Sequence, residues 1–376
     1  MIQRIVSKLI ANHLYKGKAI ILIGARQVGK TTLINELLKN IPEKKLIING
    51  DEADSFFWAI EPTVVKLRAL IGDHKIVFID EAQRIPNIGI IMKLIIDNIA
   101  DVQVIATGSS AFDLSNRTNE PLTGRKYEFQ LFPFSFHELV QHSNLPEEIK
   151  MLNQRLIFGN YPEIITKPAE QTKLLSLLAG SYLFKDLLAL DFIRKPDLLD
   201  KIIRALAFQI GNEVNYLELS QLVGYDKQTV EKYIDLLEKT YVIFKLPAFS
   251  RNLRNEIKKG RKIYFYDNGI RNAVIGNFSD IETRTDRGAL WENYLISERK
   301  KLLSYQDRSS KSYFWRTFQQ SEIDYIEEES QRISAYEFKW NSKATWKIAK
   351  PFKDSYNPQT IKLIHPQNYY EFLGIE

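Results

Sequence analysis

The stretch GARQVGKTT, residues 24–32, decides the fold of this 376-residue chain. An apolar run typical of a strand precedes it at 19–23, and a run typical of a helix follows at 31–40. This strand-loop-helix context turns the spacing GxxxxGK[ST] into a physical prediction of a phosphate-binding loop, or P-loop. The alternative is a glycine-rich turn that carries a lysine by chance, and the flanking strand and helix argue against it.

Each residue type in this loop has a predicted task. Gly24 and Gly29 let the backbone wrap closely enough for its N–H groups to face phosphate oxygens, and the helix dipole adds attraction. Lys30 is expected to reach the β and γ phosphates of ATP and to assist catalysis, and the Thr31 hydroxyl to bind Mg²⁺. ATP and Mg²⁺ are therefore the predicted cofactors. The predicted ATP-binding residues are Gly24, Ala25, Arg26, Gln27, Val28, Gly29, Lys30, Thr31 and Thr32.

The composition, 44% hydrophobic and 12% aromatic, is that of a folded protein, and the length indicates two or three domains. No cysteine is present, which excludes disulfides, thiolate metal sites and a cysteine nucleophile, and fits a reducing cytoplasm. The five histidines lack metal-ligand spacing. Because no segment approaches the roughly 20 apolar residues of a membrane span, we expect a cytoplasmic protein with no membrane partner.

The basic excess of the chain is concentrated in one place. Residues 251–320 carry 15 Lys and Arg against 8 Asp and Glu, whereas the rest of the chain carries 37 against 38. A partner with a phosphate backbone, above all DNA, needs such a concentration. A solvated basic face would give the same pattern, so charge alone leaves both interpretations open.

Strands and helices alternate up to about residue 130, which predicts a parallel sheet covered on both faces. A second strand is expected at 45–49, then an acidic turn at 50–54, a helix through residue 70 and a third strand at 75–83. The third strand is apolar at 76–79 and delivers Asp80 and Glu81 to its carboxyl end, where ligands bind in such sheets. This Walker B pattern predicts that Asp80 holds Mg²⁺ and that Glu81 polarises the attacking water.

Two further parts of this region are candidates for contacts with the γ-phosphate. A fourth strand at 101–106 is followed by Thr107 and Ser109, either of which could bind the water or the γ-phosphate beside Asp80. The stretch 122–136 predicts a loop, a fifth strand and a turn. Arg125 and Arg117 could donate positive charge to the phosphate, although ordinary loop arginines would look the same.

The middle of the chain changes character twice. Residues 137–213 read as helices only, entered through a capping box of Ser135 and Glu138, and predict a small helical lid. Residues 216–252 then predict a helix, a turn at Gly224, a second helix from Lys227 and a strand hairpin that closes at 262–266, a winged helix-turn-helix. The second helix exposes both lysines and acids, so DNA contact and intramolecular packing both stay open.

The last third contains residues suited to metal-dependent phosphodiester chemistry. Glu292 lies on a predicted helix, Asp324 in a strand, and Glu337 and Lys339 on one face of the next strand. An antiparallel hairpin with a loop near 328–333 would place Asp324 opposite Glu337. Asp324 and Glu337 could then bind Mg²⁺ while Glu292 and Lys339 assist, as in PD-(D/E)xK nucleases. The alternative is a surface hairpin with ordinary alternating charges.

The order of these motifs resembles that of a prokaryotic family. Its members join an AAA-type ATPase domain to a helical lid, a winged helix and a C-terminal nuclease-like domain of unknown function. The resemblance implies ATP binding at residues 24–32, hydrolysis through Asp80 and Glu81, and a nuclease-like set of Glu292, Asp324, Glu337 and Lys339. Relatives tend to carry a Gly-Lys turn where this chain has Gln-Gln-Ser at 319–321. The resemblance rests on the motifs GARQVGKTT, FIDEAQ, TGSSAFDL, LTGRKYEFQLFPFSFHEL, GNYPEI, RGALWENYLISE, YFWRTFQQSEIDYI and YEFKW.

The predicted fold class is α/β: a P-loop NTPase domain (1–136), a helical lid (137–213), a winged helix (214–270) and an α/β nuclease-like domain (271–376). The first functional hypothesis is a Mg²⁺-dependent ATPase whose nucleotide state controls a DNA-associated C-terminal domain. The second is a nucleotide-dependent switch whose C-terminal domain binds a DNA or protein partner without cutting, and the third is a DNA-binding module alone. AAA-type sites often take an arginine from a neighbouring subunit, which makes a homo-oligomer plausible.

Overall fold

The computed structural model describes residues 2–109, 121–182, 195–250, 260–317, 321–344 and 350–375. The chain divides into two compact units. The N-terminal unit comprises Met1–Phe132 with Lys239–Tyr241, and the C-terminal unit comprises Pro133–Glu238 with Val242–Glu376. The four-part division expected from the sequence stays a prediction.

The N-terminal unit is built on a five-stranded sheet in which every pairing is parallel. Its strands are β1 (Ala19–Ile23), β2 (Lys45–Asn49), β3 (Ile76–Asp80), β4 (Gln103–Gly108) and β5 (Lys126–Gln130), in the order β2-β3-β4-β1-β5. All residues of β1 and β4 are buried, as expected for strands covered on both faces. The predicted α/β fold class is confirmed.

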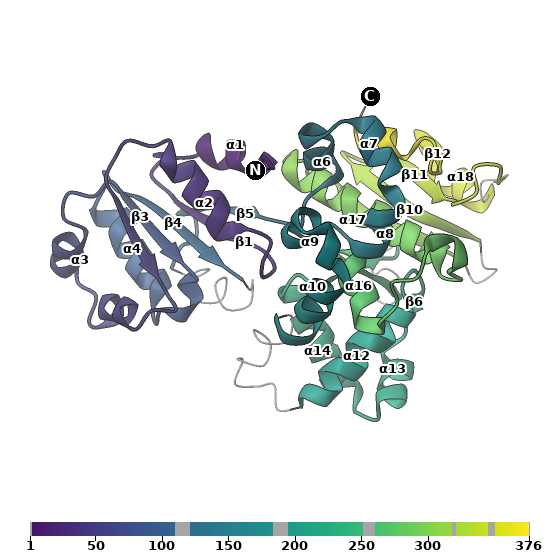
Figure 1. Ribbon diagram of the computed structural model, residues 1–376, viewed down its shortest axis with the longest axis horizontal. Helices are drawn as coiled ribbons and strands as arrows, with labels where there is room; N and C mark the ends of the chain where they lie inside the picture. The colour runs from purple at the N-terminus through teal and green to yellow at the C-terminus, as the bar shows by residue number, and fades with distance from the viewer. Residues whose placement is uncertain are drawn as a thin grey trace. The chain divides into compact units, whose positions relative to one another are not determined.

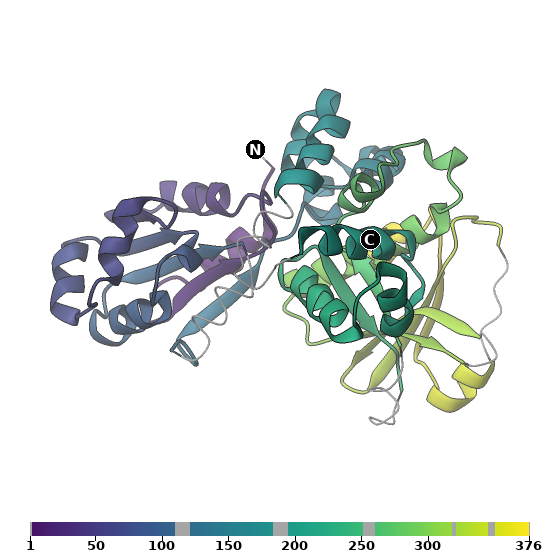
Figure 2. The same ribbon diagram turned by 90° about the horizontal axis from the view of Figure 1, so that it is seen from below.

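Helices cover both faces of this sheet (Figures 1 and 2). They are α1 (Ile5–Ala11), α2 (Lys30–Lys39), α3 (Val64–Ile71) and α4 (Ile88–Asn98), with short 3-10 turns η1 (Ala53–Ala59) and η2 (Ala82–Arg84). Because crossovers between parallel strands are right-handed, α2, which leads outward from β1 to β2, lies on the face opposite α3 and α4, which lead back. One core cluster accordingly joins Ile21 and Val77 of the sheet to Leu67 of α3 and Ile91 of α4.

The helix that the sequence predicts through residue 70 is interrupted. Pro62 disfavours helical geometry in the residue before it, and Glu61 adopts a left-handed φ of 44°. A new helix then begins after Thr63, whose side chain accepts a hydrogen bond from the Lys66 amide at 3.3 Å. The third strand is also shorter than predicted, because it ends at Asp80.

The C-terminal unit begins with a run of helices, and the described part of 137–212 contains no strand, as predicted. The capping box at its start is confirmed: the Glu138 amide donates to Ser135 Oγ at 3.2 Å, and the Ser135 amide donates to Glu138 Oε2 at 2.9 Å. The elements are α6 (Phe136–His142), α7 (Leu145–Lys150), α8 (Leu152–Phe158), α9 (Pro162–Thr166), η3 (Pro168–Glu170), α10 (Gln171–Leu177), η4 (Leu178–Tyr182) and α12 (Pro196–Phe208).

Two helices and a small antiparallel sheet follow in the predicted order. They are β6 (Glu213–Val214), α13 (Tyr216–Val223), α14 (Lys227–Lys239), β7 (Ile243–Pro247) and β8 (Arg261–Phe265). Gly224 ends α13 with a left-handed φ of 76°, so the chain turns sharply before α14. The sheet order is β6-β8-β7, which places β8 in the centre.

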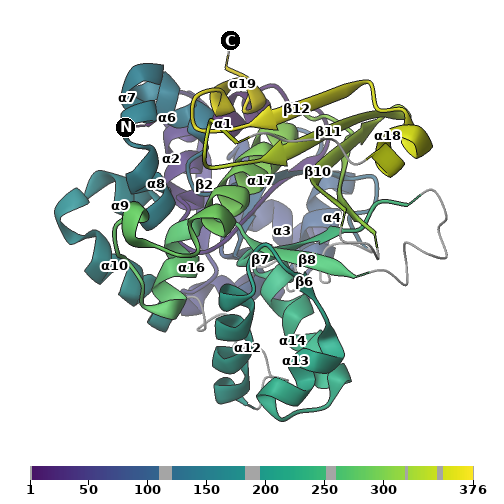
Figure 3. The ribbon, with the colours of Figure 1, turned by 90° about the vertical axis from the view of Figure 1, so that its right-hand side faces the viewer.

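The last part of the chain forms a four-stranded sheet in the order β12-β11-β10-β9, with the long helix α17 beside β8 (Figure 3). The elements are α16 (Asn268–Ile275), η5 (Ile281–Thr283), α17 (Arg287–Tyr305), β9 (Lys311–Arg316), β10 (Glu322–Glu329), β11 (Arg332–Phe338), α18 (Lys350–Tyr356), β12 (Thr360–Ile364) and α19 (Tyr369–Phe372). The β10–β11 hairpin is antiparallel as predicted, but its turn is tighter. Ser330 and Gln331 both have positive φ, as two-residue hairpin turns require.

The two sheets of the C-terminal unit are joined edge to edge just after β7. Ala248 pairs with Phe314 of β9, and the Phe249 amide donates to the Phe314 carbonyl at 2.6 Å. Phe249 also shares a core cluster with Trp315 and Ile323. This junction brings β8 close to β10 although the two strands are about 60 residues apart in sequence.

Among the described residues, no helix combines the length and the apolar character that crossing a membrane requires.

Replacing Ser135 with alanine is expected to lower the free energy of unfolding by about 1 kcal/mol, because the capping bond to the Glu138 amide is lost. Urea unfolding followed by circular dichroism measures the change. Ser176→Ala is the control: Ser176 lies inside α10, its hydroxyl bonds only the Thr172 carbonyl, and alanine favours helix. An equal loss in both variants would contradict the capping role.

Candidate functional site

The P-loop wraps around the end of β1. Gly29 has a φ of 93° and begins α2, and Gln27 is also left-handed with a φ of 59°. Gly24 lies so close to the segment after β5 that a Cβ would be 2.2 Å from the Leu131 carbonyl oxygen. Glycine at 24 and 29 is therefore required by close approach and by backbone conformation, as the sequence predicts.

The Lys30 side chain lies along the inside of this loop. The residue is only 5% exposed, and its Nζ donates to the carbonyl oxygens of Gly24 and Ala25, at 2.9 Å each. An ammonium group held there lies beside the backbone amides of the loop and adds a positive charge to them. The loop is thus arranged to attract an anion.

The Asp80 carboxylate at the end of β3 connects this strand to β4 and to the first turn of α2. Thr31 Oγ1 donates to Asp80 Oδ2 at 2.8 Å, and the Thr107 hydroxyl at the end of β4 donates to Oδ1. Thr107 Oγ1 in turn accepts a hydrogen bond from the Glu81 amide at 3.2 Å. A hydroxyl and a carboxylate side by side are a suitable donor set for Mg²⁺, so the residues present fit this ion.

Glu81 is held in an unusual backbone conformation by its neighbours. Its φ of 47° lies in the left-handed region, which costs a residue other than glycine about 1–3 kcal/mol. Its side chain accepts a hydrogen bond from Gln83 Nε2, and the same amide group also donates to Ser109 Oγ at 3.2 Å. Gln83 therefore links the two predicted site residues. Gln83 is not among the residues predicted from the sequence, although its position two residues after Glu81 indicates that the two side chains could meet.

Gly50, at the end of β2, approaches the Walker B segment directly. Its amide donates to the Asp80 carbonyl at 2.8 Å, and a Cβ would lie 2.4 Å from the Glu81 carbonyl oxygen. Only glycine permits this contact, which holds the end of β3 against the end of β2.

The C-terminal carboxylates predicted from the sequence also lie together. Asp324 Oδ2 accepts a hydrogen bond from the Phe338 amide at 2.8 Å, and Lys339 Nζ lies 2.7 Å from Glu337 Oε1. Burial raises the pKa of Asp324 well above its usual value, and the charges of Glu292 and Glu337 raise it further. The buried Oε2 of Glu337 has no hydrogen-bond partner among the described residues.

A residue that the sequence did not predict lies within this group. Lys262 of β8 is buried, and its Nζ lies 2.9 Å from Glu292 Oε1 and 2.6 Å from Glu322 Oε1. The Tyr264 hydroxyl also donates to Glu292 Oε1. Burial lowers the pKa of Lys262, but the carboxylates Glu292, Glu322 and Asp324 outweigh burial and raise it overall, so Lys262 is charged.

These contacts do not fit a Mg²⁺ ion at Asp324 and Glu337. Glu292 is already bonded to a lysine and a tyrosine, and one oxygen each of Asp324 and Glu337 is bonded to protein donors. No three acidic or histidine side chains in the described part of the chain are arranged to hold a metal. The predicted carboxylates meet, but with a lysine among them.

Comparison with known families agrees with the P-loop geometry. Residues 16–140 match the family model of the AAA domain. The N-terminal unit is an AAA-type P-loop domain. Its strand order and its loop are those of a nucleotide-binding ATPase fold. Two other models, both described as domains of unknown function, match the rest of the chain: DUF8612 over residues 149–281 and DUF4143 over residues 287–370.

Proteins of other organisms match this chain over most of its length. An uncharacterized protein of Mycobacterium tuberculosis is 25% identical over 337 residues, which cover 88% of this chain and 72% of the relative. An uncharacterized protein of Methanocaldococcus jannaschii is 24% identical over 357 residues, with coverages of 82% and 74%. Their descriptions assign no activity.

Two solved structures match only distantly. Pif1 helicase from Candida albicans is 15% identical, with a TM-score of 0.27 and 48% of each chain covered. The Drosophila ORC bound to AT-rich DNA and Cdc6 is 11% identical, with a TM-score of 0.26 and coverages of 72% of this chain and 90% of that one. Likenesses at such TM-scores carry no argument about function.

Arg125, one of the two candidates for a contact with the γ-phosphate, lies at the edge of the AAA sheet opposite the P-loop. Arg125 precedes β5, and its carbonyl oxygen accepts a hydrogen bond from the Ala19 amide at the start of β1. Arg125 therefore lies at the amino edge of the sheet. Its Nε lies 2.6 Å from Asp97 Oδ1. Because all five strands are parallel, the P-loop and Asp80 lie at the opposite edge. Arg117 lies outside the described residues.

A second arginine, which the sequence analysis missed, contacts the P-loop from behind. Arg4 is buried, and its guanidinium donates to the carbonyl oxygens of Val28, at 2.9 Å, and Phe132. It therefore ties the loop to the end of the fifth strand. No sequence signal separates this arginine from the other cations of the amphipathic α1 segment.

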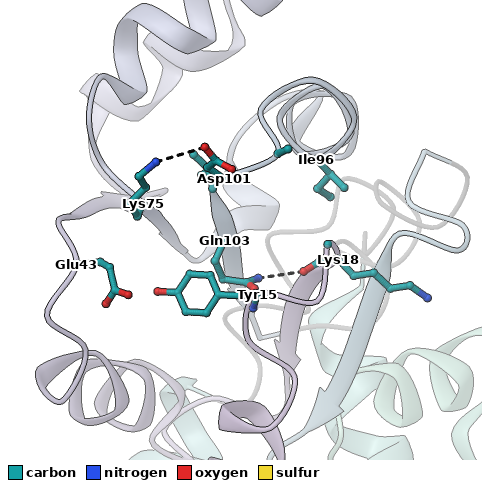
Figure 4. Close-up of a pocket in the computed structure, with 10 residues that line it drawn as sticks. Tyr15, Lys18, Glu43, Lys75, Ile96, Asp101 and Gln103 are labelled. Atoms are coloured by element: carbon teal, nitrogen blue, oxygen red, sulfur yellow. Dashed lines mark hydrogen bonds and ion pairs between the residues drawn. The ribbon is translucent and has the colours of Figure 1, made fainter.

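A pocket of about 430 Å³ lies at the amino edge of the AAA sheet (Figure 4). Tyr15 points its hydroxyl toward Glu43 there, and Lys75 Nζ lies 3.6 Å from Asp101 Oδ2. Gln103 Nε2 donates to the Lys18 carbonyl at 3.0 Å. This edge is opposite the P-loop, so the pocket is separate from the nucleotide site.

The basic stretch, for which the sequence leaves a DNA-facing surface and a solvated face both open, is partly internal. Of the 11 cations of 251–320 that the structure describes, five are buried, and each pairs with a carboxylate: Lys262, Arg271, Arg284, Arg299 and Lys301. Arg299, for example, binds both oxygens of Glu327. These five charges are neutralised inside the C-terminal unit, and residues 251–259 lie outside the described part. The net charge of the stretch, counted from the sequence, is therefore larger than the charge that it contributes to the surface.

Replacing Gly50 with alanine is expected to destabilise the AAA domain by about 1–3 kcal/mol, because the added carbon would overlap the Glu81 carbonyl. Thermal unfolding by calorimetry measures the change. Gly288→Ala is the matched control, since a Cβ there meets no atom within 4 Å. Unchanged stability of the Gly50 variant would contradict the close approach of β2 and β3.

Proposed function

We propose that this protein binds ATP together with Mg²⁺ and hydrolyses it in the AAA domain. The observation that carries the proposal is the hydrogen-bonded chain from Thr31 through Asp80 to Thr107. In this chain the P-loop hydroxyl, the predicted Walker B carboxylate and a hydroxyl near the carboxyl end of β4 lie at one edge of the sheet. Phosphoryl transfer needs positioning and charge stabilisation at such a point.

The loop residues would bind the phosphates. Lys30 would exchange its two carbonyl contacts, on Gly24 and Ala25, for phosphate oxygens. Thr31 and Asp80 would hold Mg²⁺, which when bound supplies positive charge to the phosphate oxygens. Arg4 would keep Val28 in place behind the loop.

Glu81 would orient the attacking water and accept its proton. Gln83 would position the Glu81 carboxylate, since one amide group holds both Glu81 and Ser109. Thr107 would link Asp80 to Glu81, because its hydroxyl donates to the Asp80 carboxylate and accepts a hydrogen bond from the Glu81 amide. A left-handed backbone at Glu81 is consistent with a strained catalytic segment.

The proposed role of the C-terminal unit is to bind a partner under control of the nucleotide state. Its helix-turn-helix and hairpin support a winged helix, and DNA is a candidate partner. On α14 the exposed cations include Lys227 and Lys232, but Asp235 and Glu238 of the same helix pair with Lys245. This mixed face supports DNA weakly and supports protein contact equally well.

Mg²⁺-dependent DNA cleavage at Asp324 and Glu337 is not part of this proposal, because the contacts of these carboxylates do not fit the ion. The ion pairs of Lys262 favour the switch that binds a partner without cutting. We also propose a cytoplasmic location, which supplies ATP and Mg²⁺, and a homo-oligomer whose second copy donates an arginine, since Arg125 lies at the far edge.

Lys30→Ala is expected to abolish ATP turnover, because the loop loses the ammonium group that is expected to reach the β and γ phosphates. Release of inorganic phosphate from ATP and Mg²⁺ measures the rate. Lys39→Ala is the control: Lys39 lies in the same helix but is exposed and pairs with Glu36. Wild-type turnover in Lys30→Ala would contradict the proposed ATPase. The same assay with single-stranded and double-stranded DNA tests the partner: a rate that DNA leaves unchanged would count against DNA control.

Gln83→Ala is expected to lower kcat by about tenfold to a hundredfold while KM for ATP changes little, because a misplaced carboxylate slows the chemical step. Glu81→Gln is expected to lower kcat by about 10²–10⁴-fold in the same assay. The double variant should be no slower than Glu81→Gln alone, since Gln83 acts through Glu81. Additive losses would contradict the positioning role of Gln83.

A further inference from the structure

The most unusual side chain of the C-terminal unit is the buried lysine at the centre of its carboxylates. The Lys262 side chain is only 2% exposed, and it comes from the middle strand of a three-stranded sheet. Its ammonium group bridges Glu292 of α17 and Glu322 of β10. It therefore joins three elements that only the tertiary structure brings together.

The surroundings of this ammonium group are built to hold a cation. Glu292 Oε1 accepts hydrogen bonds from both Lys262 and Tyr264, and Glu322 Oε1 lies 2.6 Å from the Lys262 ammonium group. Lys262 Nζ also lies 5.5 Å from the centre of the Phe314 ring, within range of a cation–π contact. Carboxylates on one side and an aromatic face on the other leave the ammonium group well satisfied.

We propose that Lys262 is the resident cation of this carboxylate cluster and takes the place that a divalent metal would otherwise fill. The C-terminal unit then keeps Glu292, Glu322 and Asp324 together without a metal ion. This inference goes beyond the proposed ATPase and does not depend on it, because no residue of the P-loop takes part.

The physical reason is competition for the same oxygens. A divalent ion that bound Glu292 and Asp324 would repel the ammonium group and take its partners. Lys262 would then be a buried cation without compensation, which proteins avoid because burying an unpaired charge is very costly. The lysine is fixed to a central strand, so it cannot simply move into solvent. The native cluster therefore disfavours divalent ions.

Lys339, by contrast, cannot play this part. Its side chain is 40% exposed, and its ammonium group lies 2.7 Å from Glu337 Oε1 at the edge of the cluster. A lysine at the rim leaves room beside it, whereas Lys262 occupies the interior of the cluster. Removing the charge of Lys262 should therefore open a site that removing Lys339 would not.

The test is Mn²⁺ binding to the full chain without nucleotide, measured by electron paramagnetic resonance. We expect Lys262→Met to bind Mn²⁺ about 10–100-fold more tightly than wild type, the range seen when groups that govern a metal's ligands are changed. Adding Asp324→Asn to Lys262→Met should abolish the gain, which assigns the new site to this cluster. Lys301→Met is the matched control. Lys301 is also buried and lies 2.6 Å from Glu298 Oε1, but it is not bonded to Glu292 or Glu322.

The wild-type arm alone can overturn the proposal. If wild type binds Mn²⁺ and Asp324→Asn removes that binding, a divalent ion shares the cluster with Lys262 and the proposal is wrong. An equal gain in Lys301→Met would also contradict it. Circular dichroism confirms that each variant is folded. Should Lys262→Met not fold alone, rescue of its fold by Mn²⁺ supports the proposal, and no rescue counts against it.

Discussion

The hydrogen bonds on the Asp80 carboxylate are the interaction on which the nucleotide site depends. They exist because β4 lies between β1 and β3 in a parallel sheet, so the three carboxyl ends meet at one edge. Thr31 of the P-loop and Thr107, near the carboxyl end of β4, then both bond to a single carboxylate. A change in strand order would separate these groups and remove the site.

Charge in the C-terminal unit follows a different constraint. Its buried lysines and arginines pair with carboxylates, and several of these pairs join helices to strands across long stretches of sequence. Arg299 binds Glu327 of β10, and Lys262 binds Glu292 and Glu322. A buried charge is stable only when it is paired, so these contacts fix the arrangement of the elements. The same need explains why a lysine lies among carboxylates that could otherwise attract a metal ion.

Distant elements decided two features that the sequence left open. Arg125 was a candidate for the γ-phosphate because it lies in a loop before a strand, but the parallel direction of β5 places it at the far edge. The basic stretch left a DNA-facing surface open, but Arg271 and Arg299 turn inward to carboxylates. The helix before residue 70 was drawn too long, because Pro62 and Glu61 interrupt it. The first two cases share one cause, since charge and loop position are local and burial is not.

The sequence by itself determined the parts whose physics is local: the five strands of the AAA domain, the P-loop glycines, the Walker B acids, the capping box at Ser135 and the hairpin that carries Asp324 and Glu337. Each of these follows from spacing, apolar periodicity or backbone conformation within a few residues. Only the tertiary structure decided that Gln83 bonds to Ser109, that Arg4 supports the P-loop and that Lys262 lies among the carboxylates. These contacts depend on where a side chain points and on which buried partner compensates its polar groups, and no stretch of sequence specifies either.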